Sequence, residues 1–142
     1  MSALPALVHT AEPINTEWGV DNRTVGIRSP VSTPQARRVE NRVVGADANP
    51  YLALAATLAC GYLGIEQRLQ PTQECAGDAY QSAQALPRSL ADAVSLLRDA
   101  TDLAQVLGQE FLTVYTEIKD LEHEEFMRVI SPWEREHLLL HV

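Results

Sequence analysis

The chain is poor in basic residues. Lysine and arginine supply 11 of its 142 residues against 19 acidic residues, which gives a formal net charge of −8. Binding to a phosphate backbone or to an anionic membrane surface draws on a surplus of positive charge, so this balance argues against both kinds of partner. Hydrophobic residues make up 46% and charged residues 21%. These shares are ordinary for a folded globular protein.

Cysteine and long apolar runs are also scarce. The two cysteines are Cys60 and Cys75, and a pair of this kind indicates reduced thiols in a cytoplasmic protein rather than a disulfide framework. The longest apolar stretch, residues 51–65, is shorter than the roughly 20 residues that a membrane span requires. The opening residues lack the basic region of a secretory signal. We expect a cytoplasmic location and no membrane segment.

The first half of the chain reads as extended backbone followed by a helix. Residues 1–14 have no periodicity and are expected to be a loosely ordered leader. Apolar and polar residues alternate along 24–28 and 38–43, which predicts two strands within residues 15–45. Asn49 and Pro50 predict the start of a helix over 49–69. Its apolar residues lie on nearly every side, so we expect this helix to be buried.

The second half reads as a linker followed by helices. Residues 70–87 contain two prolines and a glycine and are expected to be a linker. The region 88–141 is expected to be helical, with an N-cap at Ser89, a restart at Thr101 and an interruption at Gly108. The sequence 131–134 predicts a capping box with proline at the first helical position. No internal repeat is present.

The charged residues of the predicted strands suggest a site. Five of the basic residues fall within twenty positions, and Arg38, Glu40 and Arg42 share one strand face at spacings of two. With Arg28 and Gly26 on the first strand they could form a cationic floor with one carboxylate, a surface suited to a polyphosphate and a divalent cation. The alternative is a solvated edge strand whose arginines and glutamate pair with each other. The residues alone favour this alternative.

Other groups of residues give weaker evidence for a functional site. His137 and His141 are one helical turn apart, but a chance pair in a terminal helix explains them better than a zinc site. The acidic run 122–125 is typical of a solvated helix face. No glycine-rich phosphate loop and no spacing typical of a catalytic triad is present.

Three motifs in one order carry a specific resemblance. Residues 22–28 (NRTVGIR), 38–42 (RVENR) and 48–53 (ANPYLA) closely resemble the end of the catalytic domain of glutamine synthetases. The similarity runs from about Trp18 to the C-terminus. It implies an α+β fold: the C-terminal part of that catalytic domain over residues 15–142, with two or three antiparallel strands followed by a mostly helical region.

The resemblance also implies roles for particular residues. Glu40 matches a metal-ligand glutamate of the family, for Mg²⁺ or Mn²⁺. Arg23, Arg28 and Arg38 match arginines at the ATP phosphates, and Arg23 also matches one that contacts glutamate. Arg42 matches the arginine that binds glutamate and the transferred phosphoryl group. In the family, glutamate and ATP form γ-glutamyl phosphate, and ammonia or an amine then displaces phosphate to give an amide.

The resemblance indicates the acceptor substrate less clearly than it indicates the family. The segments 18–23, 77–80, 86–90 and 133–136 look more like the γ-glutamylpolyamine type than the ammonia-using type. We therefore expect a polyamine or other amine as acceptor, with ammonia as the alternative.

The resemblance covers only about the last third of a family member. The earlier strands that carry most metal-binding glutamates, and the N-terminal β-grasp domain, have no counterpart in these residues. We expect a truncated, split or cut portion that is inactive alone and needs the missing N-terminal part or full-length subunits, in a family of homo-oligomers. The competing expectation is a non-catalytic truncated paralogue that binds or modulates a full-length synthetase.

Overall fold

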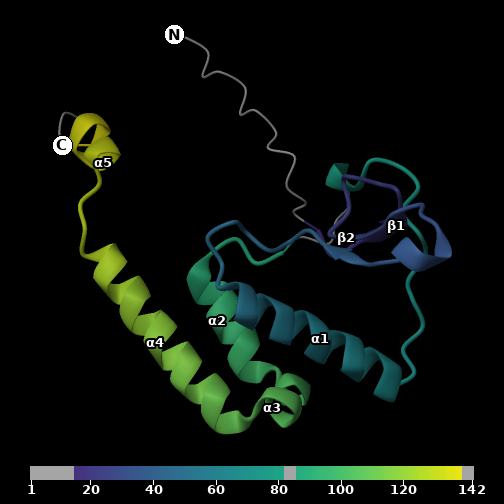
Figure 1. Ribbon diagram of the computed structural model, residues 1–142. Coiled ribbons are helices and arrows are strands. Elements are labelled where there is room, and N and C mark those ends of the chain that lie inside the picture. The colour runs from purple at the N-terminus through teal and green to yellow at the C-terminus, as the bar shows by residue number, and fades with distance from the viewer. Residues whose placement is uncertain (1–14, 82–85, 139–142) are drawn as a thin grey trace, which may run out of the picture. The chain divides into compact units, whose positions relative to one another are not determined.

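The computed structural model describes residues 15–81 and 86–138, and these belong to two compact units, Met1–Leu86 and Pro87–Val142. A three-stranded sheet and one long helix form the first unit, and helices form the second (Figure 1). The predicted α+β class is confirmed. The leader expected at residues 1–14, and His141 of the terminal histidine pair, lie outside the described residues.

The sheet has the order β1-β2-β3 and mixed strand directions. Its strands are short: β1 spans Trp18–Val20, β2 spans Ile27–Ser29 and β3 spans Glu40–Asn41. β2 and β3 are antiparallel as predicted, whereas β1 and β2 are parallel. The prediction of two or three antiparallel strands is met by β2 and β3, and β1 is a third strand in the parallel direction. Alternating side chains look the same in either direction, so the sequence pattern does not fix the direction of a strand.

Asn15 holds the sheet unit together from inside. Its side chain is 1% exposed. Its Nδ2 donates to the carbonyl oxygens of Thr24 (2.9 Å) and Ala79 (3.1 Å). Its Oδ1 accepts from the amides of Glu17 (3.1 Å) and Gly26 (3.2 Å). One amide group thus satisfies four backbone groups, which a buried site requires.

The segment 72–79 covers the outer edge of β1, although the sequence suggested only a linker there. The indole Nε1 of Trp18 donates to the carbonyl of Thr72 (2.9 Å), and the amide of Cys75 donates to the carbonyl of Trp18 (2.9 Å). The side chain of Asn22 donates to the carbonyls of Cys75 and Gly77, both at 2.8 Å. These bonds fill the open edge of the sheet, which would otherwise present unpaired backbone groups.

Helix α1 spans Pro50–Glu66 and begins as the sequence predicts. The Asn49 side chain accepts from the amides of the first turn, and proline stands at the first helical position. Its expected burial is not found in this chain, because Ala59 is its one buried residue whereas Tyr51 and Ile65 are more than 80% exposed. A hydrogen bond of 2.9 Å from Asn41 Nδ2 to Thr57 Oγ1 joins β3 to the middle of α1.

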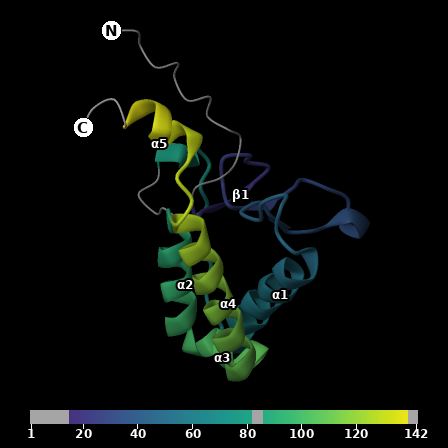
Figure 2. The ribbon, with the colours of Figure 1, turned by 90° about the vertical axis from the view of Figure 1, so that its left-hand side faces the viewer.

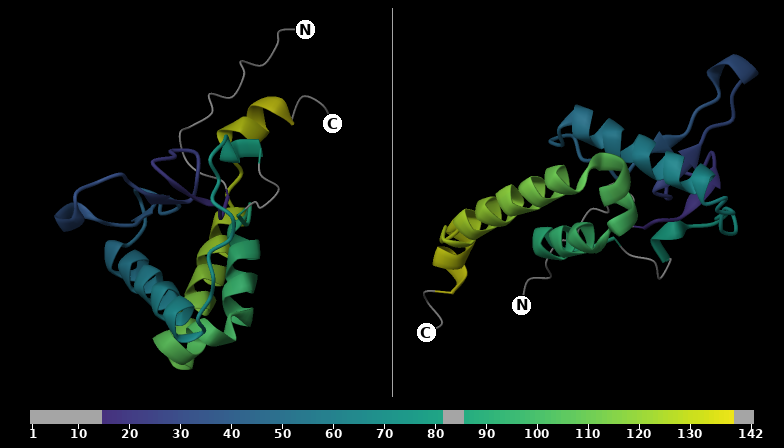
Figure 3. Two further views of the ribbon diagram at one scale, coloured as in Figure 1. Left: turned by 90° about the vertical axis from the view of Figure 1, so that its right-hand side faces the viewer. Right: turned by 90° about the horizontal axis from the view of Figure 1, so that it is seen from below.

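The second unit consists of α2 (Leu90–Asp99), α3 (Thr101–Leu107), α4 (Gln109–Met127) and α5 (Pro132–His137). Ser89 caps α2, Gly108 separates α3 from α4 with a φ of 96°, and Ser131 forms a capping box, all as predicted. α2 and α4 lie side by side (Figures 2 and 3). No helix among the described residues is long and apolar enough to cross a membrane.

Candidate functional site

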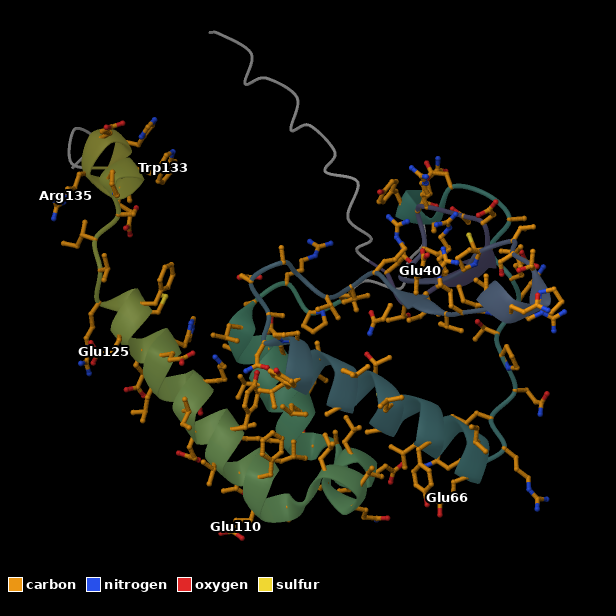
Figure 4. All side chains as sticks on the ribbon, in the orientation of Figure 1. Glu40, Glu66, Glu110, Glu125, Trp133 and Arg135 are labelled. Atoms are coloured by element: carbon orange, nitrogen blue, oxygen red, sulfur yellow. The ribbon has the colours of Figure 1, made fainter. Side chains whose placement is uncertain are left out.

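Four charged side chains gather on the sheet. We call Asp21, Arg28, Arg38 and Glu40 the charged cluster. Arg28 Nη1 lies 3.0 Å from Glu40 Oε2, and its Nη2 pairs with Asp21 Oδ1. Arg38 binds Glu40 Oε1 through Nη2 at 2.9 Å and Nε at 3.0 Å. Glu40, labelled in Figure 4, lies on the sheet and accepts from both arginines.

The register of the strands builds this cluster. In the antiparallel pair, Arg28 of β2 lies directly opposite Glu40 of β3, so both side chains leave the same face of the sheet. Arg38 is two residues before Glu40 and shares its face. The structure thus brings together three of the predicted site residues: Arg28, Arg38 and Glu40.

The electrostatics of the cluster favour its charged forms. The hydrogen bond that Arg28 donates to Asp21 raises the pKa of the Arg28 guanidinium, burial opposes this rise, and Glu40 adds to it. Burial raises the pKa of the Glu40 carboxyl, but the hydrogen bonds and the positive charges of Arg38 and Arg28 together lower it, so that pKa lies below its ordinary value. The pairing therefore stabilises the fold at neutral pH and is lost as the pH falls through the lowered pKa of Glu40.

The two other predicted site residues, Arg23 and Arg42, lie in segments next to the strands of the cluster. Arg23 is exposed in the turn between β1 and β2. Arg42 follows β3, is half-buried, and donates its backbone amide to the carbonyl of Gly26 (2.9 Å). Gly26 was expected to let a ligand approach the backbone. The close neighbour is instead the chain itself, because a Cβ at Gly26 would lie 2.3 Å from the carbonyl oxygen of Asn15.

Glu40 fits a divalent cation only as one member of a ligand set. Its carboxylate oxygens are hard donors of the kind that Mg²⁺ and Mn²⁺ take, and Oε2 accepts one hydrogen bond, which leaves a lone pair. The described residues hold no group of three side chains that could bind a metal. Further ligands would have to come from substrate oxygens or from protein beyond the described residues.

Asp21 is the member of the cluster that sequence reasoning missed. Its position after β1 and its place within the motif 18–23 gave no reason to pair it with Arg28. The parallel register of β1 and β2 is the signal that could have found it. This register places Val20 opposite Ser29, so Asp21, the next residue after Val20, lies near the end of the strand that carries Arg28.

Two hollows are lined by other residues. The first, in the sheet unit, is lined by Glu17, Glu74, Cys75 and Asp78 among others. The second, in the helical unit, is lined mainly by α4 and by Arg98, whose guanidinium pairs with Asp120 and lies 3.7 Å from Glu117. Neither hollow includes a predicted site residue.

Comparison with known proteins identifies the family of the motifs. The profile described as "Glutamine synthetase, catalytic domain" matches residues 7–138. The glutamate–isopropylamine ligase of a Pseudomonas species is 39% identical over 124 residues, which cover 84% of this chain and 27% of the ligase. The γ-glutamylputrescine synthetase of Escherichia coli K12 is 37% identical over 128 residues, which cover 89% of this chain and 27% of that enzyme.

A solved structure has the same fold over the matched part. The structure described as a GmaS/ADP complex aligns with a TM-score of 0.81 at 33% identity and covers 97% of this chain. The aligned part is 33% of that solved chain. The present chain thus spans about a quarter to a third of the length of the proteins that it matches.

Proposed function

Since this chain belongs to the glutamine synthetase family, we propose that it supplies the phosphate-binding arginines and one metal ligand of an ATP-dependent carboxylate–amine ligase. The reaction would join glutamate to an amine, with ATP converted to ADP and phosphate through γ-glutamyl phosphate. The observation that carries the proposal is the charged cluster. Arg28 and Glu40 stand opposite each other in the β2–β3 register, inside the two motifs that match the family.

The chemistry asked of these residues is positioning and charge neutralisation. Phosphoryl transfer spreads negative charge over the moving phosphate, and guanidinium groups match phosphate oxygens in a fixed fork. Arg23, Arg28 and Arg38 would contact the nucleotide phosphates, with Arg23 also at glutamate. Arg42 would hold glutamate and the phosphoryl group in transfer. Glu40 would supply one ligand to a divalent ion, whose positive charge would offset the negative charge of the phosphates.

The acceptor proposed is an alkylamine or polyamine. The named relatives include a glutamate–isopropylamine ligase and a γ-glutamylputrescine synthetase. Ammonia is the alternative acceptor, because the matching family profile carries the name of glutamine synthetase.

A second candidate function is a non-catalytic chain that binds a full-length synthetase. The exposed apolar side chains of α1, which include Tyr51, Leu58 and Ile65, favour it, because such a surface needs a covering protein. The two candidates separate on one test. Binding to a synthetase that survives Glu40→Ala combined with Arg42→Ala, with no effect of these changes on any ligase activity, would favour the second.

The proposal predicts that the isolated chain forms no γ-glutamyl amide, because it spans about a quarter of its relatives. We expect activity when residues 18–138 replace the matching part of the Pseudomonas isopropylamine ligase. In that chimera, Glu40→Gln is expected to lower kcat by about 100-fold or more, the scale found when one electrostatic contact to a transition state is lost. The assay follows ATP-dependent amide formation from glutamate with isopropylamine, putrescine or ammonia.

Glu66→Gln in the same chimera is the matched control. Glu66 lies at the end of α1, away from the sheet (Figure 4). Its replacement removes the same negative charge as Glu40→Gln. A folded chimera that is inactive, or one in which Glu40→Gln and Glu66→Gln behave alike, would contradict the proposed role of the cluster.

A further inference from the structure

Arg28 divides its two terminal nitrogens between two carboxylates. Nη1 donates to Glu40 Oε2 at 3.0 Å, while Nη2 donates to Asp21 Oδ1. The Arg28 side chain is 16% exposed and that of Asp21 is 53% exposed. A guanidinium fork commonly holds one carboxylate with two parallel bonds. In this structure the two terminal nitrogens bind two different carboxylates, and these two contacts together fix the plane of the guanidinium group.

The backbone holds Asp21 in place for this contact. Its φ is 53°, a left-handed conformation that few residues other than glycine adopt and that aspartate and asparagine tolerate best. Its amide donates to the carbonyl of Ser29 (3.0 Å), one residue beyond Arg28 on β2. Both the main chain and the side chain of Asp21 are thus tied to the strand that carries Arg28. Non-glycine residues in this conformation persist where the surroundings determine them strongly.

Asp21 also limits how Arg28 binds Glu40. Oε1 of Glu40 is already occupied by Arg38 through two nitrogens. Without Asp21, Nη2 of Arg28 would be freed to turn toward the same carboxylate. Glu40 would then be enclosed by two guanidinium groups, which leaves less lone-pair capacity on Oε2.

From this geometry we propose that Asp21 is a positioning residue. It holds the Arg28 guanidinium away from bidentate pairing with Glu40, so that Arg28 can contact a phosphate and Glu40 Oε2 can take a divalent cation. The part of this inference that concerns ligands rests on the proposed function. The part that concerns the orientation of Arg28 does not.

Two measurements on this chain separate these parts. The first is the side-chain ¹⁵N–¹H spectrum of Arg28, in which a guanidinium held at both ends gives separate signals for its two Nη groups. We expect separate signals in the parent and merged or shifted signals in Asp21→Asn, which keeps the shape and the tolerated backbone conformation but loses the charge. The matched control is Asp47→Asn, which removes the same charge from the exposed turn before α1.

The second measurement is the affinity for ADP with and without Mn²⁺. Asp21→Asn is expected to weaken Mn²⁺-dependent binding about tenfold, equivalent to about 1.4 kcal/mol, and to change metal-free binding less. A purely structural role would lower both affinities alike. Asp21→Gly, which suits the same φ, replaces Asp21→Asn in both measurements if that variant does not fold.

The spectrum by itself decides the part of the inference that concerns the orientation of Arg28. Unchanged Arg28 signals in Asp21→Asn, or equal changes in Asp47→Asn, overturn it whatever the nucleotide does. A parent that binds no ADP counts against the proposed function, and the spectrum still tests the positioning of Arg28. Altered Arg28 signals with unchanged Mn²⁺-dependent affinity overturn the claim that this positioning serves the ligands.

Discussion

Replacing Gly26 with alanine is expected to unfold the sheet unit. The added Cβ would lie 2.3 Å from the carbonyl oxygen of Asn15 and 3.2 Å from Val43 Cγ2. The nearer atom belongs to backbone, and Asn15 is itself held by four hydrogen bonds, so it cannot move aside without breaking them. Overpacking of this kind costs about 3 kcal/mol or more, a large part of the stability of a small unit.

The measurement is urea unfolding followed by the fluorescence of Trp18, which lies in β1. Gly61→Ala is the matched control, because nothing lies within 4 Å of its added Cβ and Gly61 lies inside α1. Alanine is favoured over glycine in a helix by roughly 1 kcal/mol, so this variant is expected to be at least as stable as the parent. A Gly26→Ala chain with the unfolding midpoint of the parent would contradict the close approach of Asn15.

Asn15→Asp is expected to destabilise the sheet unit by about 4 kcal/mol at neutral pH, the scale of an uncompensated buried charge. The change replaces an NH₂ group that donates to two carbonyl oxygens with a carboxylate oxygen that faces them at about the same distances. Repulsion and burial both raise the folded-state pKa of the new carboxyl. The folded state therefore binds its proton more tightly than the unfolded state, and the destabilisation is relieved as the pH falls.

Urea unfolding at neutral pH and at about pH 4, near the ordinary carboxyl pKa, measures this effect. Asn49→Asp is the matched control, because the Asn49 side chain accepts hydrogen bonds from the amides of Tyr51 and Leu52, and aspartate is an equally good N-cap. Equal effects of the two substitutions would contradict the account of Asn15. So would a loss of stability in Asn15→Asp, measured against the parent, that is larger at the lower pH than at neutral pH.

Local signals predicted the helix ends well. Asn49, Ser89, Gly108 and the Ser131 capping box act through neighbours within four residues, so the sequence alone contains the partners. The same holds for Arg38 and Glu40, which share a strand face by spacing. The alternating pattern of the first strand also pointed to Arg28, and the antiparallel register places it opposite Glu40.

Long-range pairings were not predictable in this way. Asn15 binds Ala79 across 64 positions and Trp18 binds Thr72 across 54, and no local pattern marks either pair. Residues 70–87, which include the segment 72–79, looked like a linker because two prolines, a glycine and polar residues suit a sheet-edge cover as well as a loop. The exposed face of α1 shows the same limit, since an all-round apolar pattern predicts covering but not which protein surface provides it.

The central claim is that the charged cluster is part of a nucleotide and metal site. Isothermal titration of this chain with a nonhydrolysable ATP analogue and Mn²⁺ tests it most directly, on the parent, Glu40→Gln and Glu66→Gln. We predict saturable, Mn²⁺-dependent heat in the parent and in Glu66→Gln, and its loss in Glu40→Gln. Heat that persists unchanged in Glu40→Gln, or a folded parent that gives none, would contradict the claim.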